Sequence, residues 1–147
     1  MVSLLDVNVL VALAWPNHLH HDRAHEWFGA HSHEGWATCP VTQCGFVRVS
    51  SNPAVFRDAV MPVDAARVLA AMTSHRHHRF WPCDLPFSDA VSACAGTLTG
   101  HRQVTDCYLL GLAVQRGGRL VTFDGGTAQL LDQEAAAGHL AVIAPTA

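Results

Sequence analysis

Three aspartates stand where a carboxylate could take part in metal or phosphate chemistry. Asp6 and Asp124 each follow a short apolar run, and Asp106 lies at the start of an apolar segment with helical spacing. If the two runs are buried parallel strands, Asp6 and Asp124 reach the carboxyl edge of the sheet, where open α/β sheets bind their ligands. Each aspartate alone could simply favour a helix dipole or open a turn. Two buried strands that both end in aspartate favour a shared site.

Convergence of these three carboxylates would create a strong demand for a cation. At ~5 Å and an effective dielectric of ~20, each bare pair repels by about 3 kcal/mol. Such a cluster either raises its pKa values or recruits a metal ion. Hard oxygen ligands without a companion imidazole or thiolate favour Mg²⁺ or Mn²⁺ over Zn²⁺. Mg²⁺ held in this way polarises phosphoryl oxygens and activates water, so we expect chemistry on phosphate esters.

The basic residues narrow that chemistry further. All nine are arginine, and the chain contains no lysine. Phospho-receiver domains and aspartyl-phosphate hydrolases both need a late lysine, and the hydrolases also need Asp-x-Asp where this chain has Asp6-Val-Asn8. Of the Mg²⁺-using classes considered, metal-dependent nucleases therefore remain the best match. With a net charge of −3, any RNA contact must come from local arginines, helix N-termini or a bound metal.

The elements that would position these side chains alternate between short apolar strands and helices. We expect strands at residues 3–8, 36–41, 120–123 and 140–143, and an edge strand or connector at 80–87. We expect helices at residues 9–14, 18–30, 43–50, 65–74, 106–116 and 128–137, and another that begins at Ser88. This alternation predicts an α/β fold, a parallel β-sheet with helices on both faces, in a single domain over residues 1–147.

Several polar residues are expected to cap or decorate these helices. Asn17 and Thr105 suit N-caps, as does Thr42, and Gly117 suits a left-handed helix end. Three histidines follow helical spacing in the helix predicted at 18–30: His18, His21 and His25. A zinc site there would need at least one more ligand. Exposed histidines on the helix surface are the preferred interpretation.

Composition excludes several broad classes. Of the 147 residues, 50% are hydrophobic and only 14% are charged, which argues against disorder. The apolar stretch at 9–15 is too short to span a bilayer, so neither a signal peptide nor a membrane anchor is expected. The five cysteines form no C-x-x-C pair, and an odd number cannot close into a complete disulfide framework. A reduced cytoplasmic compartment fits this pattern best.

Four segments resemble, in order, the motifs of the PIN-domain ribonucleases, in particular the VapC toxins of bacterial toxin–antitoxin pairs. They are residues 4–10, 38–48, 104–110 and 119–124. The resemblance implies PIN-like α/β/α layers. It also implies that Asp6, Asp106 and Asp124 are the catalytic, metal-binding acidic residues, with Asn8 and Thr122 as polar support.

The same resemblance implies an activity and partners. It predicts endonucleolytic cleavage of RNA by a water activated by Mg²⁺ or Mn²⁺, association into a homodimer and inhibition by a cognate antitoxin that covers the site. Arg48 and Arg102 are the candidates for contacts with the RNA backbone.

Gln43 departs from the family pattern, because the second motif normally carries glutamate there. Glutamine keeps a carbonyl acceptor but has no charge and cannot serve as a general base. Glu34 cannot replace it, because six strand residues at ~3.3 Å place it roughly 20 Å away. Either three aspartates suffice, or the protein is a weakened or inactive relative that still binds RNA or the antitoxin.

If Gln43 is part of the metal site, Gln43→Glu should tighten Mg²⁺ binding, because it restores a charged oxygen ligand. Isothermal titration calorimetry of both proteins measures the effect. An unchanged affinity would count against a place for residue 43 in the site.

Overall fold

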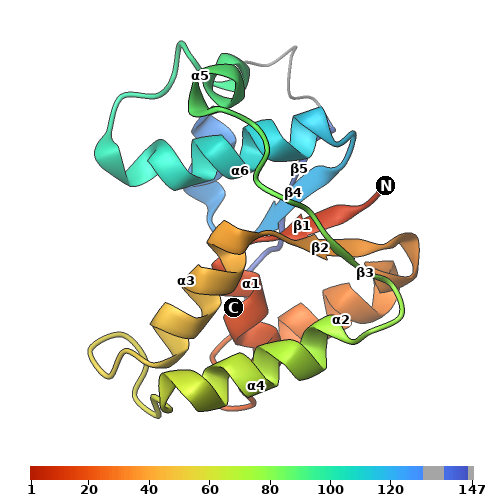
Figure 1. Cartoon of the computed structure of the whole chain (residues 1–147), viewed down its shortest axis with the longest axis vertical. Helices are drawn as coiled ribbons and strands as arrows, with labels where there is room; N and C mark the ends of the chain where they lie inside the picture. The colour runs from red at the N-terminus through yellow and green to blue at the C-terminus, as the bar shows by residue number, and fades with distance from the viewer. Residues whose placement is uncertain (131–137, 146–147) are drawn as a thin grey trace.

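Five parallel strands form one sheet in the order β3-β2-β1-β4-β5 (Figure 1). The computed structural model describes residues 1–130 and 138–145. The strands are β1 Ser3–Leu5, β2 Trp36–Thr38, β3 His78–Phe80, β4 Arg119–Thr122 and β5 Leu140–Val142. The central strand β1 pairs with β2 on one side and with β4 on the other. The predicted α/β class with a parallel sheet is confirmed.

Helices cover both faces of this sheet. They are α1 Val7–Ala14, α2 His21–His31, α3 Pro40–Ser50, α4 Pro62–Thr73, α5 Phe87–Ala90 and α6 Val104–Gln115. Short 3₁₀ helices span Ser32–Glu34, Val91–Ala93, His101–Gln103 and Gly125–Leu130. In Figure 1, α5 and α6 lie above the sheet and α1 to α4 lie below it. Among the described residues, every helix is too short or too polar to cross a membrane.

The alternation of side chains along each strand divides the core into two halves. Leu5 and Val121 pack among the apolar residues of α1 to α4. Their neighbours Leu4 and Leu120 point to the opposite face and pack against α6. All four side chains are fully buried, as expected for a parallel sheet covered on both faces. The sheet therefore reads as continuous apolar runs in the sequence.

Three residues predicted to be N-caps, Asn17, Thr42 and Thr105, do not cap the helices that form. The second helix begins at His21 rather than residue 18, and the Asn17 side chain hydrogen-bonds to Asp58 instead of capping it. The third begins at Pro40, where the Thr42 hydroxyl accepts the Cys39 N–H at 3.0 Å from inside the first turn. The sixth begins at Val104, one residue before the predicted cap. In each case, the observed helix begins before or after the residue that was expected to cap it.

Other predicted boundaries hold more closely. Gly117 has a φ of +65° directly after α6, which confirms the left-handed helix end. The segment predicted at 80–87 as an edge strand or connector is a connector over residues 81–86, and the edge strand β3 lies just before it. Of the helix predicted at 128–137, residues 128–130 are 3₁₀ helix, and the remainder lies outside the described residues.

Two histidines of α2 close the carboxyl end of α1. His21 Nδ1 lies 2.8 Å from the Ala12 carbonyl oxygen, and His25 Nε2 lies 2.9 Å from that of Leu13. These carbonyls lie in the last turn of α1, where the helix itself supplies no backbone N–H to bond them. His25 is exposed on the helix surface, as predicted, whereas His21 is half-buried, and both rings also bond to α1.

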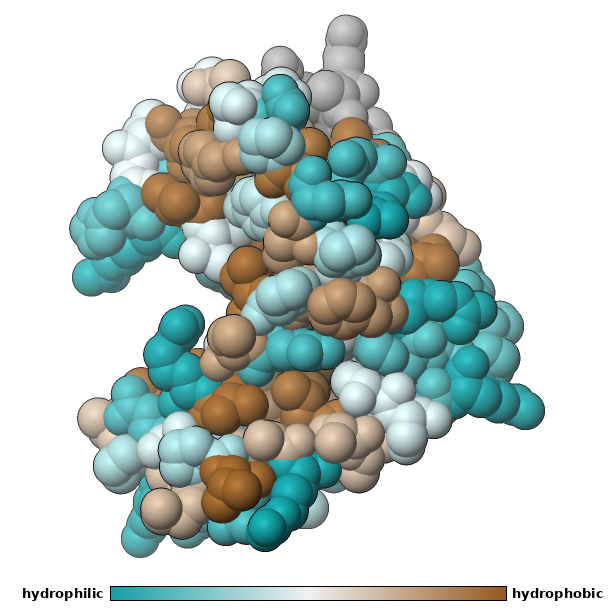
Figure 2. Space-filling model, in the orientation of Figure 1, coloured by the Kyte–Doolittle hydropathy of each residue, from teal (hydrophilic) through white to brown (hydrophobic). Residues whose placement is uncertain are grey.

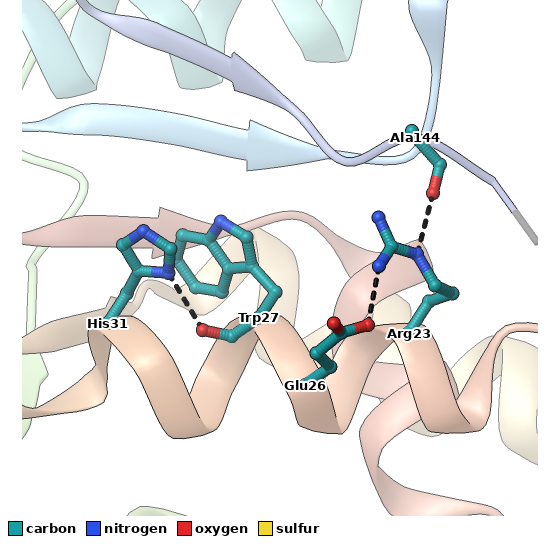
Figure 3. Close-up of polar contacts among 5 residues, drawn as sticks. All are labelled: Arg23, Glu26, Trp27, His31 and Ala144. Atoms are coloured by element: carbon teal, nitrogen blue, oxygen red, sulfur yellow. Dashed lines mark hydrogen bonds and ion pairs between the residues drawn. The ribbon is translucent and has the colours of Figure 1, made fainter.

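Helix α2 is also tied to the chain that follows β5. Figure 3 shows Arg23 reaching from α2 to the Ala144 carbonyl, with an Nε to oxygen distance of 3.3 Å, while the same guanidinium pairs with Glu26. One turn further on, His31 Nδ1 lies 2.8 Å from the Trp27 carbonyl oxygen, and the two rings stack. The Arg23–Ala144 bond therefore ties α2 to the chain after β5, whereas the Trp27–His31 contact lies within α2.

Cys94 and Cys107 form a disulfide between the Val91–Ala93 turn and the first turn of α6. Both residues are fully buried beside Leu130. Cys39, Cys44 and Cys83 are free thiols. The expectation that the cysteines are reduced is wrong for the bonded pair, because pairing depends on which chain segments meet and not on the number of cysteines.

Gly111 is the point of closest approach between α6 and α5. A Cβ atom added there would lie 2.5 Å from the Ala90 carbonyl oxygen and 2.7 Å from its Cα. Because these are backbone atoms, no rotamer change could relieve the clash. The contact holds the short α5 segment against the sheet-covering helix.

Gly111→Ala should lower the free energy of unfolding by about 1 to 2 kcal/mol, because overpacking against Ala90 outweighs the helix propensity that alanine gains. Urea denaturation measures it. Gly29→Ala on α2 is the matched control, since a Cβ there meets no described atom within 4 Å, and it should stabilise by about 0.5 to 1 kcal/mol. Equal stabilisation by both substitutions would contradict the packing of α5 on α6.

Candidate active site

Asp6 occupies the junction between β1 and α1. It is the N-cap of α1, and its Oδ1 accepts the Val7 N–H at 2.7 Å. Its other oxygen, Oδ2, accepts the Thr122 hydroxyl at 2.8 Å. The residue is only 8% exposed. The first predicted carboxylate is therefore fixed by one bond to its own helix and one to a neighbouring strand.

The Thr122 hydroxyl lies at the centre of this network. While it donates to Asp6, its oxygen accepts the Asn8 side-chain amide at 3.1 Å and the Asp124 N–H at 3.0 Å. Asn8 Oδ1 in turn accepts the Phe123 N–H at 3.2 Å. The predicted supporting residues Asn8 and Thr122 thus join the ends of β1 and β4 and set the position of the loop that carries Asp124.

The other two carboxylates come from α6 and from the loop after β4. Asp106 lies in the first turn of α6, and its Oδ2 lies 3.5 Å from the Thr127 hydroxyl. Asp124 Oδ1 accepts the Gly126 N–H at 2.8 Å, which closes a tight turn. Each carboxylate therefore keeps at least one oxygen lone pair free of these protein contacts.

All three aspartates line one cavity of about 390 Å³. Val7, Asn8, Val11, His18, Val49 and Val55 complete its lining. Figure 2 shows a notch at the left of the molecular surface. In Figure 1, which has the same orientation, the chain passes from β2 into α3 on this side. The three aspartates therefore meet around one cavity at the carboxyl edge of the sheet, as predicted.

The carboxylates affect each other's protonation. Burial, together with the negative charges of Asp6 and Asp124, raises the pKa of Asp106 to about 6. Burial also raises the pKa of Asp6, although the bonds from Thr122 and Val7 partly offset this effect. The site therefore concentrates more negative charge than it can stabilise alone, as expected for carboxylates awaiting a cation.

The donor set fits a hydrated hard cation better than a closed metal cage. Within residues 1–130 and 138–145, no group of three His, Cys, Asp or Glu side chains, the three aspartates included, is close enough together to hold a metal ion jointly. This finding disfavours the zinc interpretation, since structural zinc needs about four ligands. Mg²⁺ keeps several waters and is usually held by one or two carboxylates, which three aspartates around one cavity can provide.

The other predicted site residues lie outside this cavity. The Gln43 side-chain amide donates to the Thr38 hydroxyl at 3.0 Å. Together with Arg48, Gln43 lines a separate groove of about 520 Å³ between α3 and α4. Arg102 is exposed in the 3₁₀ helix before α6. The structure therefore brings the three aspartates, Asn8 and Thr122 together, and leaves the glutamine and both arginines at the periphery.

Two residues of the site were not predicted. His18 lines the acidic cavity from the turn between α1 and α2, where a surface position on a helix was expected. Thr127 approaches Asp106 from the loop after Asp124. Neither has a sequence signal of its own, because each position depends on how distant segments pack.

A separate cavity of about 340 Å³ has a largely apolar lining. It lies between α2 and α4 and is lined mainly by apolar and aromatic side chains, including Phe28, Trp36 and Met72. No carboxylate lines it. The acidic cavity is therefore the candidate active site.

Comparison with known proteins assigns the family. The family model described as PIN domain matches residues 3–130. The chain is 51% identical over 128 residues to ribonuclease VapC39 of Mycobacterium tuberculosis, covering 87% of this chain and 92% of that protein. It is 52% identical over 132 residues to ribonuclease VapC38 of the same organism, covering 90% and 92%.

Solved structures agree on the fold. The crystal structure of M. tuberculosis VapC20, titled a sarcin–ricin loop cleaving toxin, superposes with a TM-score of 0.65 at 16% identity, covering 98% of this chain and 99% of that one. VapBC2 from Rickettsia felis, bound to a DNA fragment from its promoter, gives 0.60 at 11% identity, with 88% and 93% covered. The chain belongs to the PIN-domain family and, within it, to the VapC ribonucleases.

Proposed function

We propose that this protein is a metal-dependent endoribonuclease toxin that uses Mg²⁺ or Mn²⁺ and is inhibited by a cognate antitoxin. The observation that carries the proposal is the meeting of Asp6, Asp106 and Asp124 in one cavity, where burial and the charges of the other two raise the pKa of Asp106. Two relatives that share half of their residues with this chain are named ribonucleases.

The protein's own groups prepare the site in two ways. The Thr122 hydroxyl and the Val7 N–H fix both oxygens of Asp6, so its carboxylate cannot rotate away from the cavity. The Gly126 N–H holds one oxygen of Asp124. When bound to these carboxylates, a divalent cation supplies charge neutralisation for the phosphodiester and lowers the pKa of a water that attacks phosphorus.

The proposed RNA substrate and protein partners follow from membership of the VapC family. A net charge of −3 gives little general attraction for RNA, so local cations must position the backbone. Arg48 and Arg102 are exposed on two elements outside the acidic cavity, and we assign them this role. The solved VapBC2 structure supports an antitoxin partner for this chain. Homodimer formation is proposed from the family resemblance.

The inactive-relative alternative is less well supported. It depended on the missing glutamate at position 43, but the Gln43 amide is engaged with Thr38 and lines the groove between α3 and α4. The three aspartates and their hydrogen-bonded supports are all present without it.

Asp6→Asn should reduce RNA cleavage at least about 100-fold, because it removes a charged metal ligand while keeping the shape of the side chain. Purified protein without antitoxin is incubated with total cellular RNA in Mg²⁺, Mn²⁺ or chelator, and the cut positions are mapped. Asp64→Asn is the matched control, since Asp64 is exposed on α4 and pairs with Arg67; it should cleave as the wild type does.

Discrete metal-dependent cuts that disappear in Asp6→Asn would establish the proposed nuclease. Intact RNA with the wild-type protein in every metal, or equal cleavage by Asp6→Asn, would reject it. Binding of RNA that survives chelator without any cleavage would instead favour the inactive binding module.

Asp106→Asn should stabilise the metal-free protein at about pH 7.5 and have little effect near pH 4. The folded state binds a proton at Asp106 more tightly than the unfolded chain, with a pKa of about 6 against the ordinary 3.8. The stability contributed by this group therefore falls as pH rises through that interval and stays low above it. The full shift corresponds to about 3 kcal/mol, which solvent screening at this partly exposed carboxylate reduces to about 1 kcal/mol.

Urea denaturation in chelator at the two pH values measures this difference. Saturating Mn²⁺ should stabilise the wild type more than Asp106→Asn, since a cation that binds only the folded protein stabilises it by mass action. A destabilising Asp106→Asn at the higher pH would contradict the charge repulsion inferred here.

A further inference from the structure

His18 stands where the acidic cavity meets a second one. It lines both the 390 Å³ cavity that holds the three aspartates and a neighbouring cavity of about 430 Å³. Val55 is the other residue that both cavities share. An RNA strand whose phosphate lies at the aspartates would therefore pass His18 before its next nucleotide enters the second cavity.

We propose that His18 and the second cavity form a subsite for the nucleotide next to the scissile phosphate, with His18 Nε2–H donating a hydrogen bond to the phosphate of that nucleotide. This inference rests on the proposed ribonuclease function. It assigns a substrate-positioning residue and a nucleotide-binding cavity that the metal chemistry alone does not require.

The tautomer of His18 follows from its backbone contact. The His20 N–H donates to His18 Nδ1 at 3.0 Å, so Nδ1 is an acceptor and the proton of the neutral ring is on Nε2. Burial, followed by the neighbouring rings of His20 and His21, lowers the pKa of His18. The ring is thus a neutral donor, which can bind a phosphate without repelling a cation at the aspartates.

The turn that carries His18 is firmly held. The His18 N–H donates to the Trp15 carbonyl at 3.0 Å, and the His18 carbonyl accepts the His21 N–H at 3.1 Å. The Trp15 indole donates to the Ser50 hydroxyl at 3.0 Å and stacks on Phe46. A donor on such a turn loses little freedom when it binds a ligand.

The chemistry of the second cavity suits a nucleotide. Leu19 and Val55 are 77% and 66% exposed and, with Phe56, offer apolar surface to a base. Arg57 supplies a cation at the same cavity. The carboxylate of Asp58 also lines it, but this group is engaged by the Asn17 amide. Apolar surface beside a cation, continuous with the acidic cavity, matches a base joined to a phosphate.

The test uses an RNA oligonucleotide that spans a cut mapped with the wild-type protein. His18→Ala should raise KM about tenfold and leave kcat within about threefold, because one hydrogen bond to substrate is lost. His18→Gln keeps a neutral donor and should restore KM to within about threefold. His33→Ala, an exposed histidine at the amino edge of the sheet, is the control and should change neither constant. Mn²⁺ affinity should be the same in all four proteins.

Replacement of single phosphates by methylphosphonate identifies the contact. At one position beside the cut, the wild type should lose about tenfold in kcat/KM, whereas His18→Ala should lose nothing more there. If His18→Ala does not fold, His18→Phe keeps the ring without the donor and takes its place.

Two results would overturn the subsite. One is an unchanged KM for the variant without a donor, and the other is an equal loss by wild type and variant at every neighbouring phosphate. Failure of the wild-type protein to cut RNA, or equal cutting by Asp6→Asn, would instead reject the ribonuclease function on which the subsite rests.

Discussion

The arrangement of the acidic site depends on the hydroxyl of Thr122. This side chain is fully buried, donates to Asp6 and accepts from Asn8 and from the Asp124 backbone. A hydroxyl has one donor and two acceptor positions, and all three are used here. The end of β1, the first turn of α1 and the loop after β4 therefore share one atom. Two of the three carboxylates take their positions from it.

This network works against an electrostatic cost. Burial and mutual repulsion raise the pKa of Asp106 and of Asp6, so the folded protein holds charges that it does not neutralise. The bonds at Asp6 lower that cost without removing it. In the proposed function a divalent cation completes the balance, and the two-sided packing of the sheet provides the rigidity needed to keep the carboxylates together until the ion binds.

The turn that lines one side of the acidic cavity also stabilises neighbouring helices. The turn that carries His18 joins α1 to α2, and two histidines of α2, His21 and His25, bind the terminal carbonyls of α1. Trp15 fastens the same turn to α3. Because these contacts already hold the turn in place, His18 is free to face the cavity. The region that closes a helix end thus also shapes the proposed path of the RNA.

The sequence by itself determined the fold class and the placement of Asp6 and Asp124, because apolar runs specify buried strands and a residue just after a parallel strand must reach the sheet edge. The direction of the Gln43 side chain, the partner of His25 and the place of His18 were decided only by the tertiary structure. Each depends on segments distant in the chain, and the hydrogen-bond partners that packing supplies have no local pattern.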